Sequence, residues 1–412
     1  MPKINIIEKD YTTGGFAEIE NIVYIPGLFG ATSTAKNAAV AAAKETPTLC
    51  TSVKDLTTYF GDQAQDKSYV MAYELLNLGM YVLYEGFDSA ENLRKATFNK
   101  LKDKGLYNIR FLTLGGYASK VEEVEKDTGK TDKDVFDNAL IKNMKDCAEA
   151  RGDCIALIDH PEDYSINLET FDTQNPYDLF KSKFAAAFTP WCYFNITAPT
   201  LKKIDGTSSL TNANGYVSLP GSYCYLAAFA QSVRTNPTWY AVAGSIRGQI
   251  PNMVKPCRLY GELDAEILNH RNEGKVAVNP ICNINPYGYI IWGNRTLHSV
   301  GAATVPQSDL VASNFLNIRN LVTDIRKTVW TACRRLTFEQ NNDILWINFK
   351  AQITPLLDRM STGNGISGYK MIKQAPDRKA QLKAKIRIIP VEAVEDFDIT
   401  LELTDSLEII TE

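Results

Sequence analysis

The clearest hydrophobic pattern lies near the end of the sequence, where apolar residues recur every three or four positions in two stretches. The first stretch contains Phe315, Ile318, Val322, Ile325, Val329, Cys333 and Leu336. The second contains Trp346, Phe349, Ile353, Leu356 and Met360. This spacing predicts two amphipathic helices. Asn342 or Asp343 is placed to cap the second helix, and Pro355 predicts a kink or a fresh start within it.

Two alternating patterns follow, after a glycine-containing segment at 361–368 that ends the second helix. In the first, Ala384, Ile386 and Ile388 alternate with Lys383, Lys385 and Arg387. In the second, Phe397, Ile399, Leu401 and Leu403 alternate with Asp398, Thr400, Glu402 and Thr404. They predict one strand with a basic outer face and one with an acidic outer face. Side by side, each pair of opposite charges would contribute about 0.2 to 1 kcal/mol.

The central part of the chain alternates between strand-like and helix-like segments. Strands are expected at 22–27, 81–84, 109–114, 155–159, 191–197, 240–243, 276–281 and 287–292. Helices are expected at 53–60, 69–78, 132–150, 178–187 and 221–233. Ser52, Thr131 with Asp134, and Pro220 are placed to open three of these helices. The alternation predicts a layered α/β domain with a largely parallel sheet.

Both ends of the sequence carry short strand patterns that have no obvious sheet of their own. Residues 3–8 alternate around Ile4 and Ile6 and are followed by a Thr/Gly segment at 11–15. One interpretation is a frayed terminus. The other is a strand donated to the sheet of a neighbouring molecule. The strand pattern from Phe397 onward allows the same second interpretation.

Length and composition narrow the class of protein. A chain of 412 residues exceeds the size at which one hydrophobic core keeps growing, so two or three domains are expected. Its 45% hydrophobic and 22% charged residues are typical of a soluble protein. The net charge of -4 and the lack of a Lys/Arg cluster in the sequence exclude nucleic acid as an expected partner. No signal peptide or apolar run of about 20 residues is found, so we expect a cytoplasmic protein without direct membrane insertion.

Cofactor and metal motifs were examined and none fits. Gly363, Gly365 and Gly368 match the letters of a dinucleotide-binding loop, but they follow a predicted helix instead of a strand. Residues 61–68 resemble a P-loop, except that Asp66 occupies the second glycine position and would repel phosphate. The eight cysteines are scattered without a Cys-x-x-Cys pair, which favours buried free thiols. We therefore expect no cofactor, no metal and no disulfide.

A Ser/His/Asp site is the remaining catalytic possibility. Asp159 and His160 stand at a predicted strand end, where α/β enzymes often place functional groups. The sequence has no Gly-x-Ser-x-Gly nucleophile turn, and neither His270 nor His298 has the spacing of a metal ligand. The favoured interpretation is a structural Asp at a strand end that caps a loop beside a surface His160, with no catalytic residue. An α/β hydrolase is kept as an alternative.

Several motifs together resemble the contractile tail sheath proteins of phage tails and related injection machines. They are Trp-Gly-Asn-Arg-Thr-Leu at 292–297, Phe-Glu-Gln-Asn at 338–341, Trp346, Gly365 with Gly368, Pro-Trp at 190–191 and Leu-Pro-Gly-Ser at 219–222. The resemblance extends over about 22–403. Asn294 and Gln340 depart from the residues that the family often has there, which are alanine and proline.

The resemblance implies a fold of the α/β plus α+β class. It consists of a central layered α/β domain of subtilisin-like architecture, a C-terminal domain of two helices and β-strands, and extended terminal arms. The implied divisions are an N-terminal arm and linker at 1–20, the N-terminal part of the sheath core at 21–104, the α/β domain at 105–300, the C-terminal domain at 301–404 and a C-terminal arm at 405–412.

The resemblance also implies a function: a structural subunit, not an enzyme, that polymerises as stacked six-membered rings around an inner tube and contracts to drive that tube through a cell envelope. The implied partners are further copies of the chain, the inner tail tube protein, and the baseplate and tail terminator proteins. The implied location is a virion tail assembled in the host bacterial cytoplasm. Another tail or baseplate structural protein with a sheath-like core remains an alternative.

Four sets of residues are candidates for these roles. Strands shared between subunits would use Ile4, Ile6, Phe397, Ile399, Leu401 and Leu403. Their charged strand partners would be Lys383, Lys385 and Arg387. Lys350, Asp358 and Arg359 lie off the apolar stripe of the second helix and are candidates to face the tube. Arg295, between Gly293 and Thr296 at a strand exit, is expected to clamp the C-terminal domain to the α/β domain.

Overall fold

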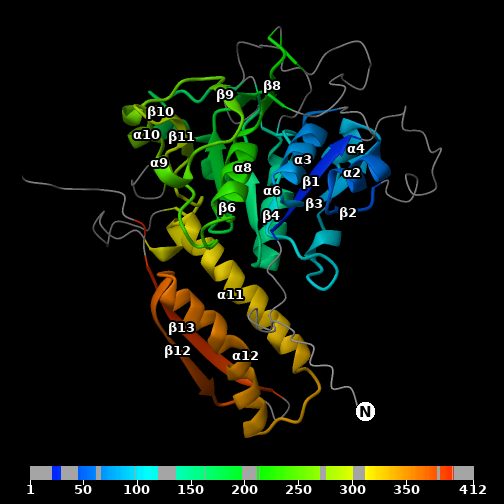
Figure 1. The fold of residues 1–412 in the computed structure, drawn as a ribbon, viewed down its shortest axis with the longest axis vertical. Coiled ribbons are helices and arrows are strands. Elements are labelled where there is room, and N and C mark those ends of the chain that lie inside the picture. Colours follow the sequence, from blue (N-terminus) through cyan, green and yellow to red (C-terminus); the bar gives the residue numbers. More distant parts are fainter. Residues whose placement is uncertain are drawn as a thin grey trace, which may run out of the picture.

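The structure is a computed structural model. It describes residues 21–28, 45–61, 66–96, 98–118, 136–162, 164–196, 211–212, 214–269, 275–299, 311–377, 381–391 and 393. Figure 1 shows two parts, an α/β part above and a smaller helix and hairpin part below. The long helix α11 (Leu316–Arg335) begins against the upper part and runs down into the lower one.

An eight-stranded sheet forms the centre of the upper part. Its strands are β1 (Ile22–Leu28), β2 (Thr48–Cys50), β3 (Tyr81–Phe87), β4 (Phe111–Leu112), β5 (Ile155–Ile158), β6 (Ala185–Thr189), β10 (Asn279–Ile284) and β11 (Gly288–Ile291), in the order β11-β10-β6-β5-β4-β1-β3-β2. The six inner strands are parallel, and the edge strands β2 and β11 pair antiparallel. The predicted layered domain with a largely parallel sheet is confirmed, and the sheet continues across position 105.

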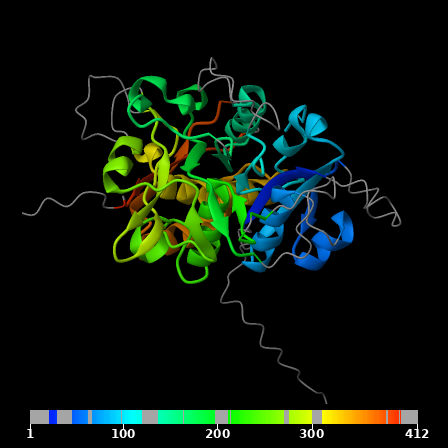
Figure 2. The ribbon, with the colours of Figure 1, turned by 90° about the horizontal axis from the view of Figure 1, so that it is seen from above.

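Helices cover both faces of this sheet, as the view from above shows (Figure 2). Successive β1 residues point to opposite faces, so that Val23 enters one hydrophobic core and Tyr24 the other. The first core is covered by α2 (Val53–Phe60), α3 (Lys67–Asn77) and α8 (Gly221–Ser232). The second is covered by α4 (Ala90–Arg94), α6 (Asn138–Arg151) and α10 (Glu262–Leu268). Both faces of the sheet are therefore buried.

Smaller elements complete the upper part. A three-stranded sheet joins β8 (Val217–Leu219), β7 (Cys192–Phe194) and β9 (Met253–Pro256) in that order. Two short helices, α7 (Phe171–Gln174) and α9 (Gly244–Arg247), and the 3-10 turns η2 (Lys100–Lys102), η3 (Pro176–Phe180) and η4 (Ala312–Asn314) lie between the longer elements.

The lower part has a hydrophobic core of its own between two helices and a hairpin. It consists of α11, α12 (Asp343–Thr362), β12 (Ile366–Gln374) and β13 (Lys383–Pro390). Asn342 caps α12 by accepting a hydrogen bond from the Leu345 amide at 3.0 Å, as predicted. A fresh start at Pro355 is wrong, because α12 continues through it while Ile353 and Leu357 on either side are fully buried. Packing of these neighbours holds the turn that the proline weakens.

Several predicted elements are confirmed, including Ser52 as the cap of α2 and the helix at 221–233. The helix predicted at 178–187 is wrong, because Ala185–Thr189 forms β6 between β5 and β10. The strand at 240–243 is wrong, since those residues form a turn before α9. Helix α6 begins at Asn138 with Asp137 as cap, later than predicted; Thr131 and Asp134 lie outside the described residues. The strand β12 was missed.

Candidate functional site

The carboxyl edge of the parallel sheet is the usual place for chemistry in an α/β fold. Here Asp66 at the start of α3 occupies the crevice beside the end of β1. Its carboxylate accepts hydrogen bonds from the Leu28 amide (2.7 Å), the Tyr69 amide (2.8 Å), the Ser68 hydroxyl (2.8 Å) and the Tyr117 hydroxyl (2.8 Å). Burial nevertheless raises the pKa of this carboxyl group. A group with this many internal partners holds the fold together and leaves little room for a ligand.

The Asp159 and His160 pair lies at the same edge and does not form a catalytic relay. The Asp159 carboxylate accepts hydrogen bonds directly from the Ser222 amide (2.7 Å) and hydroxyl (2.6 Å) at the start of α8. The His160 ring faces the Pro161 carbonyl oxygen (2.7 Å) and the Thr189 hydroxyl (3.1 Å) instead of Ser222. A nucleophilic serine needs the histidine between it and the aspartate.

Burial is the cause of the unusual ionisation of both groups. It raises the pKa of Asp159 to about 7 and lowers the pKa of His160 to about 4. At neutral pH the imidazole is therefore neutral, and the carboxyl group is close to half protonated. Asp159 lies directly after β5, at the strand end that the sequence predicted, whereas the prediction of a surface His160 is wrong, because its side chain is buried.

The described part of the chain contains no group of three His, Cys, Asp or Glu side chains placed to hold a metal ion. None of its helices is both long enough and apolar enough to pass through a bilayer. All eight cysteines are free thiols; six are buried as predicted, whereas Cys257 and Cys333 are exposed. His270 lies outside the described residues.

The junction between α11 and the upper part is a charged site that the sequence analysis missed. Asp324 of α11 forms an ion pair with Arg110 beside β4, and both side chains are almost fully buried. Thr238 donates a second hydrogen bond to the same carboxylate. One turn further on, Lys327 donates to the Ile109 carbonyl oxygen at 2.9 Å and to the Asn108 side chain. Burial lowers the pKa of Lys327 to about 8. These bonds fasten α11 to the sheet.

A signal for this junction does exist in the sequence. Asp324 stands directly beside Ile325 of the apolar stripe, and the helix as a whole is more polar than a core helix should be. A long helix with ionisable residues next to its apolar stripe is one that buries two different faces. The sequence alone could not identify Arg110, 214 residues away, as the partner.

Arg295 lies where β11 leads toward α11. Its backbone amide donates to Asn279 at 2.7 Å, and its carbonyl oxygen accepts from the Asn279 side chain at 2.8 Å. Its guanidinium stands over the Phe315 ring at 4.9 Å, and its backbone bridges to the same residue. Arg295 is 3% exposed.

The three candidate tube-facing residues lie on α12. The Lys350 ammonium stands over the Trp346 ring at 5.6 Å, and the Arg359 guanidinium stands over Trp239 at 5.9 Å. The Asp358 carboxylate accepts from the Tyr369 hydroxyl at 2.5 Å, which raises the pKa of that tyrosine. Asp358 and Arg359 are exposed and Lys350 is half-buried. The same helix also exposes two apolar side chains, Ile344 and Ile347, which were not predicted.

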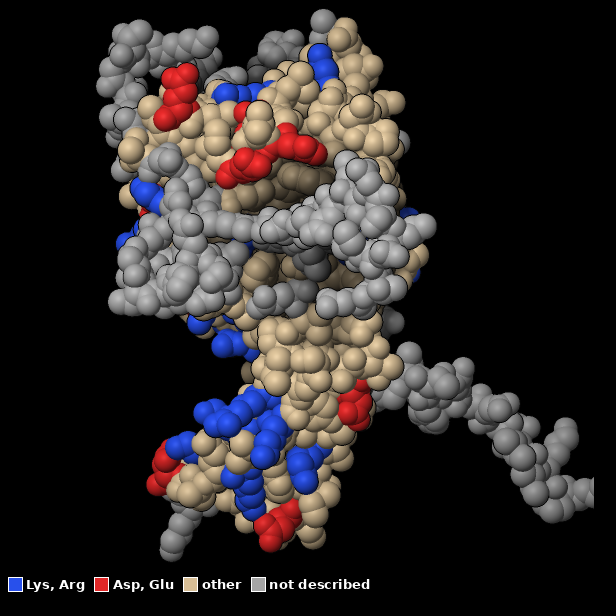
Figure 3. Space-filling model, turned by 90° about the vertical axis from the view of Figure 1, so that its left-hand side faces the viewer, with Lys and Arg blue, Asp and Glu red and all other residues tan. Residues whose placement is uncertain are grey.

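The β12 and β13 hairpin gathers cations on its outer face. Lys370 lies directly opposite Arg387, and Lys385 lies opposite Ile372. Lys383 pairs with Asp377 at 2.8 Å, whereas no ion pair is formed by Lys370, Lys385 or Arg387 within the described chain. Figure 3 faces the side of the molecule on which the hairpin lies and shows Lys and Arg gathered over the lower part. The expectation of no local Lys/Arg cluster is therefore wrong, because strand pairing joins cations from two segments.

The strand that pairs with β13 in the structure is β12, which was not predicted. The pairing of Lys383, Lys385 and Arg387 with the acidic strand at 397–403 stays a prediction. Like charges opposite each other destabilise a strand pair. The residues Phe397, Ile399, Leu401 and Leu403 lie outside the described residues, as do Ile4 and Ile6.

The fold defines the class of this protein: a layered α/β domain with both sheet faces covered, extended by a two-helix and hairpin module fastened to it through α11. Known proteins that the chain resembles are contractile tail sheath proteins. It is 24% identical to the tail sheath protein of Enterobacteria phage T4 over 236 residues, 56% of this chain and 33% of that protein. It is 20% identical to the tail sheath protein of Vibrio phage KVP40 over 230 residues, 54% of this chain and 32% of that one.

The chain spans about a third of the length of these curated relatives. No family profile matches it.

Solved structures match the chain over nearly its whole length. The PVC sheath complex of an extracellular contractile injection system, in its contracted state, has a TM-score of 0.65 at 16% identity and covers 99% of this chain and 98% of that one. The contracted helical sheath of the anti-feeding prophage has a TM-score of 0.60 at 15% identity, covering 98% and 99%. The anti-feeding prophage baseplate has a TM-score of 0.62 at 14% identity, covering 99% of each chain. These matches establish the fold and confirm the resemblance to contractile tail sheath proteins.

Proposed function

We propose that the chain is the structural subunit of a contractile tail sheath. Copies stack as six-membered rings around an inner tube, and contraction drives the tube through a cell envelope. The observation that carries this proposal is the match to sheath structures over at least 98% of both chains, which leaves little of either chain unmatched. The sequence similarity to two phage tail sheath proteins supports it independently.

On this proposal the upper part has the subtilisin-like architecture of sheath proteins without protease chemistry. The direct bonds from Ser222 to Asp159 support that interpretation, because they occupy both groups that such chemistry would need. The division into an arm at 1–20, the N-terminal part of the sheath core at 21–104, the α/β domain at 105–300, a C-terminal domain at 301–404 and an arm at 405–412 stays a prediction. The separate hydrophobic core of the lower part supports its C-terminal domain. Arg295, stacked on Phe315 at the entry to α11, would clamp the two domains.

Shared strands would hold the assembly together. Within the described residues the hairpin is a two-stranded sheet, so each strand presents an open edge that can accept another strand. The segment 392–412 contains eight Asp or Glu residues and no Lys or Arg. Such a segment from a neighbour would offset the unpaired charges of Lys385 and Arg387. Residues 3–8 would add a strand from another neighbour.

This arrangement would let the α/β parts of neighbouring subunits move while the shared strands stay paired. Each backbone hydrogen bond of a shared strand contributes about 0.5 to 1.5 kcal/mol, and the bonds of several strands add up around a ring. Contraction would reorient the α/β parts about these connections, and the energy would come from the assembly without nucleotide hydrolysis.

The inner tube would contact the exposed side of α12, with Lys350, Asp358 and Arg359 as polar contacts that are individually weak and easily broken together. The baseplate and a tail terminator protein would bind the two ends of the stack. The location that follows is a virion or injection-particle tail assembled in the bacterial cytoplasm.

Negative-stain microscopy of the purified full-length chain tests the proposal. We expect long hollow tubes at high protein concentration. Deletion of residues 1–10, or of residues 405–412, should leave a folded monomer with unchanged thermal unfolding and no tubes. Tubes of normal length from either deletion variant would overturn the shared-strand mechanism, and the absence of tubes from the full-length chain would overturn the sheath assignment.

A baseplate structural protein is the second candidate, because an anti-feeding prophage baseplate structure matches 99% of the chain. Such a protein would form closed rings or remain monomeric when expressed alone. The same microscopy experiment therefore separates the two candidates. The third candidate function is a hydrolase. A hydrolase would show ester or peptide hydrolysis that disappears in the variant Ser222→Ala.

A further inference from the structure

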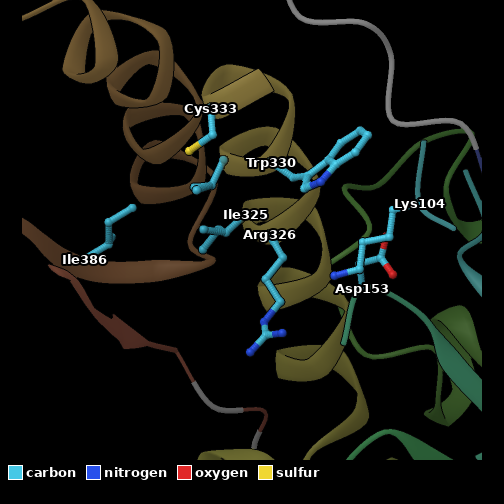
Figure 4. Close-up of a pocket in the computed structure, with 8 residues that line it drawn as sticks. Lys104, Asp153, Ile325, Arg326, Trp330, Cys333 and Ile386 are labelled. Atoms are coloured by element: carbon cyan, nitrogen blue, oxygen red, sulfur yellow. The ribbon is translucent and has the colours of Figure 1, made fainter. Parts of the chain in front are cut away.

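A groove of about 410 Å³ runs along the side of α11 that faces away from the Arg110 and Asp324 pair. Its apolar wall consists of Ile325, Val329, Trp330 and Ile386, contributed by α11 and β13. The other lining residues are Cys333, Lys104, Arg326 and Asp153, whose carboxylate is already paired with Arg151. Figure 4 shows Ile386 across from α11 and the Arg326 side chain at the lower end of the groove. The groove thus combines an apolar floor with a cationic end.

Within the residues that the structure describes, no acid pairs with that cationic end. Arg326, Arg319 and Lys183 all stand over the ring of Phe184, at 5.7, 4.7 and 5.7 Å from its centre. None of the three forms an ion pair in the described structure. Arg319 is only 6% exposed, and its Nε and Nη2 atoms have no hydrogen-bond partner. Arg326 and Lys183 are exposed and only Arg319 is buried, so a carboxylate from another molecule can pair with the exposed Arg326 guanidinium.

A surface with the complementary character exists on the same chain. Helix α10 exposes Leu263 and Ile267, which are 77% and 38% exposed. Leu259, three positions before the helix begins, is 64% exposed. Glu262 and Glu266 are also exposed on this helix, which carries no basic residue. We call these five residues the α10 ridge. Its apolar and acidic side chains alternate along one exposed surface. The apolar side chains are therefore left in contact with water in the isolated chain.

We propose that the α10 ridge of one copy of the chain docks into the α11 groove of a second copy. Leu263 and Ile267 would lie against Ile325 and Val329, and the Glu266 carboxylate would bind the Arg326 guanidinium. The inference rests on the proposed function, because it names a contact within a self-assembling subunit. Two different surfaces of one chain that bind each other make a head-to-tail contact, which closes into rings or continues as a helix.

Charge complementarity is the reason for choosing this occupant. The ridge supplies carboxylates at the end of the groove where Arg326 has no ion-pair partner among the described residues, and it supplies branched apolar side chains for the apolar wall. Arg326 is exposed, so a carboxylate can reach it without rearrangement. A guanidinium binds a carboxylate through two parallel hydrogen bonds, which would fix the direction of the ridge in the groove.

Assembly of the full-length chain, followed by sedimentation and microscopy, tests the proposal through three variants. Arg326→Glu and the double variant Glu262→Arg with Glu266→Arg each place like charges across the contact. Each should raise the protein concentration needed for assembly by about tenfold or more. Leu263→Asp should do the same without affecting the fold, because Leu263 is exposed. The matched control is Ile246→Asp, an equally exposed apolar residue outside the ridge, which should assemble normally.

A charge swap provides the decisive measurement. Combining Arg326→Glu with the double arginine variant restores opposite charges, so the combined variant should assemble at close to the original concentration. Failure of this swap to restore assembly, with each variant folded by circular dichroism, would overturn the proposal, as would normal assembly of Arg326→Glu or Leu263→Asp.

The remaining outcomes are also distinguishable. A synthetic peptide of residues 392–412 that binds the original chain and not Arg326→Glu would assign the groove to the acidic terminal segment and overturn the ridge contact. If the original chain itself never assembles, the proposed function fails. If the original chain forms tubes and the swap does not restore them, only the ridge contact fails.

Discussion

The carboxyl edge of the sheet differs from α11 and the hairpin in whether its polar side chains have partners within the chain. At the sheet edge, both oxygen atoms of Asp66 and of Asp159 accept hydrogen bonds from within the chain. Along α11, the Nε and Nη2 atoms of Arg319 have no partner, and on the hairpin Lys370 faces Arg387. The place where this kind of fold usually performs chemistry has become an internal bond network. The hairpin cations Lys370 and Arg387 are exposed, so another protein can reach them, whereas the unpartnered Arg319 atoms are buried.

The difference has an energetic meaning. A buried polar group with all its hydrogen bonds formed stabilises one conformation, and removing one partner costs the desolvation of the other. An unpaired cation near a surface destabilises the isolated chain slightly and gains when an acidic partner arrives. The upper part thus gains stability from its internal hydrogen bonds, whereas the hairpin of the lower part carries cations that an acidic partner would stabilise. The predictions below test each side of this division.

The largest expected effect is at the junction between the two parts. Replacing Asp324 by alanine leaves the buried Arg110 guanidinium without its counter-charge, and the Thr238 hydroxyl loses its acceptor. The free energy of unfolding should fall by about 3 to 5 kcal/mol, measured by urea denaturation. The control is the double variant Arg110→Met with Asp324→Leu, which removes both charges and should recover most of the loss. Equal losses in both variants would mean that packing, and not charge, dominates at this site.

The sequence predicted what depends on local periodicity. The two long C-terminal helices, their Asn342 cap, the inner strands around β1 and β5 and the helix α8 are all confirmed, because hydrophobic spacing and capping chemistry are written locally. The segment Ala185–Thr189 was mistaken for a helix since alanine favours helices; a central position between two strands decides its structure instead.

The sites depended on contacts between distant segments and were mostly not predictable. Arg110 and Asp324 are 214 positions apart, and the cations around Phe184 come from two different parts of the chain. The direct bonds between Ser222 and Asp159 were not predictable either, because the two residues are 63 positions apart. Pairing of two basic strands in the hairpin was not predictable, since the charge pattern favoured an acidic partner for β13.

Replacing Asp159 by asparagine tests the buried hydrogen bonds between Asp159 and Ser222 in the upper part. Burial gives the folded-state carboxyl group a pKa of about 7, well above its ordinary value. Between about pH 4 and 7 the folded chain therefore binds more protons than the unfolded chain, so the free energy of unfolding falls as the pH rises through this window. The total fall from this group is at most about 4 kcal/mol.

The asparagine variant should lack that fall, because its amide does not titrate and can still exchange two hydrogen bonds with Ser222. Unfolding by urea at several pH values measures it. Above pH 7 the variant should be at least as stable as the original chain. The control is Glu169→Gln, an exposed glutamate that forms no ion pair among the described residues, and its pH profile should match that of the original chain. A variant at position 159 with an unchanged pH profile would contradict the burial argument.

Arg295 should show a smaller effect. Its replacement by alanine removes the contact with the Phe315 ring at the entry to α11 while the backbone bonds to Asn279 remain possible. A loss of about 1 to 3 kcal/mol in the free energy of unfolding is expected, before any change in association. Arg295→Lys keeps the charge and should lose less. Lost assembly with unchanged thermal unfolding would instead place Arg295 at an interface between subunits.

The smallest effect on the isolated chain is expected on the outer side of α12. Lys350 and Arg359 each stand over a tryptophan ring with part of their surface in water, so replacing both by glutamate should change the free energy of unfolding by only about 1 kcal/mol. If this side faces the inner tube, the same change is repeated in every subunit along the tube, and weak polar contacts that are lost together weaken attachment strongly.

Co-sedimentation of the assembled chain with the tube protein in the extended state measures this attachment. The control is the reversal of Lys142 and Lys145 on α6, away from the lower part, which should not affect attachment. Unchanged attachment of the Lys350 and Arg359 variant would move the tube contact elsewhere, with the exposed Ile344 and Ile347 of the same helix as the next residues to replace.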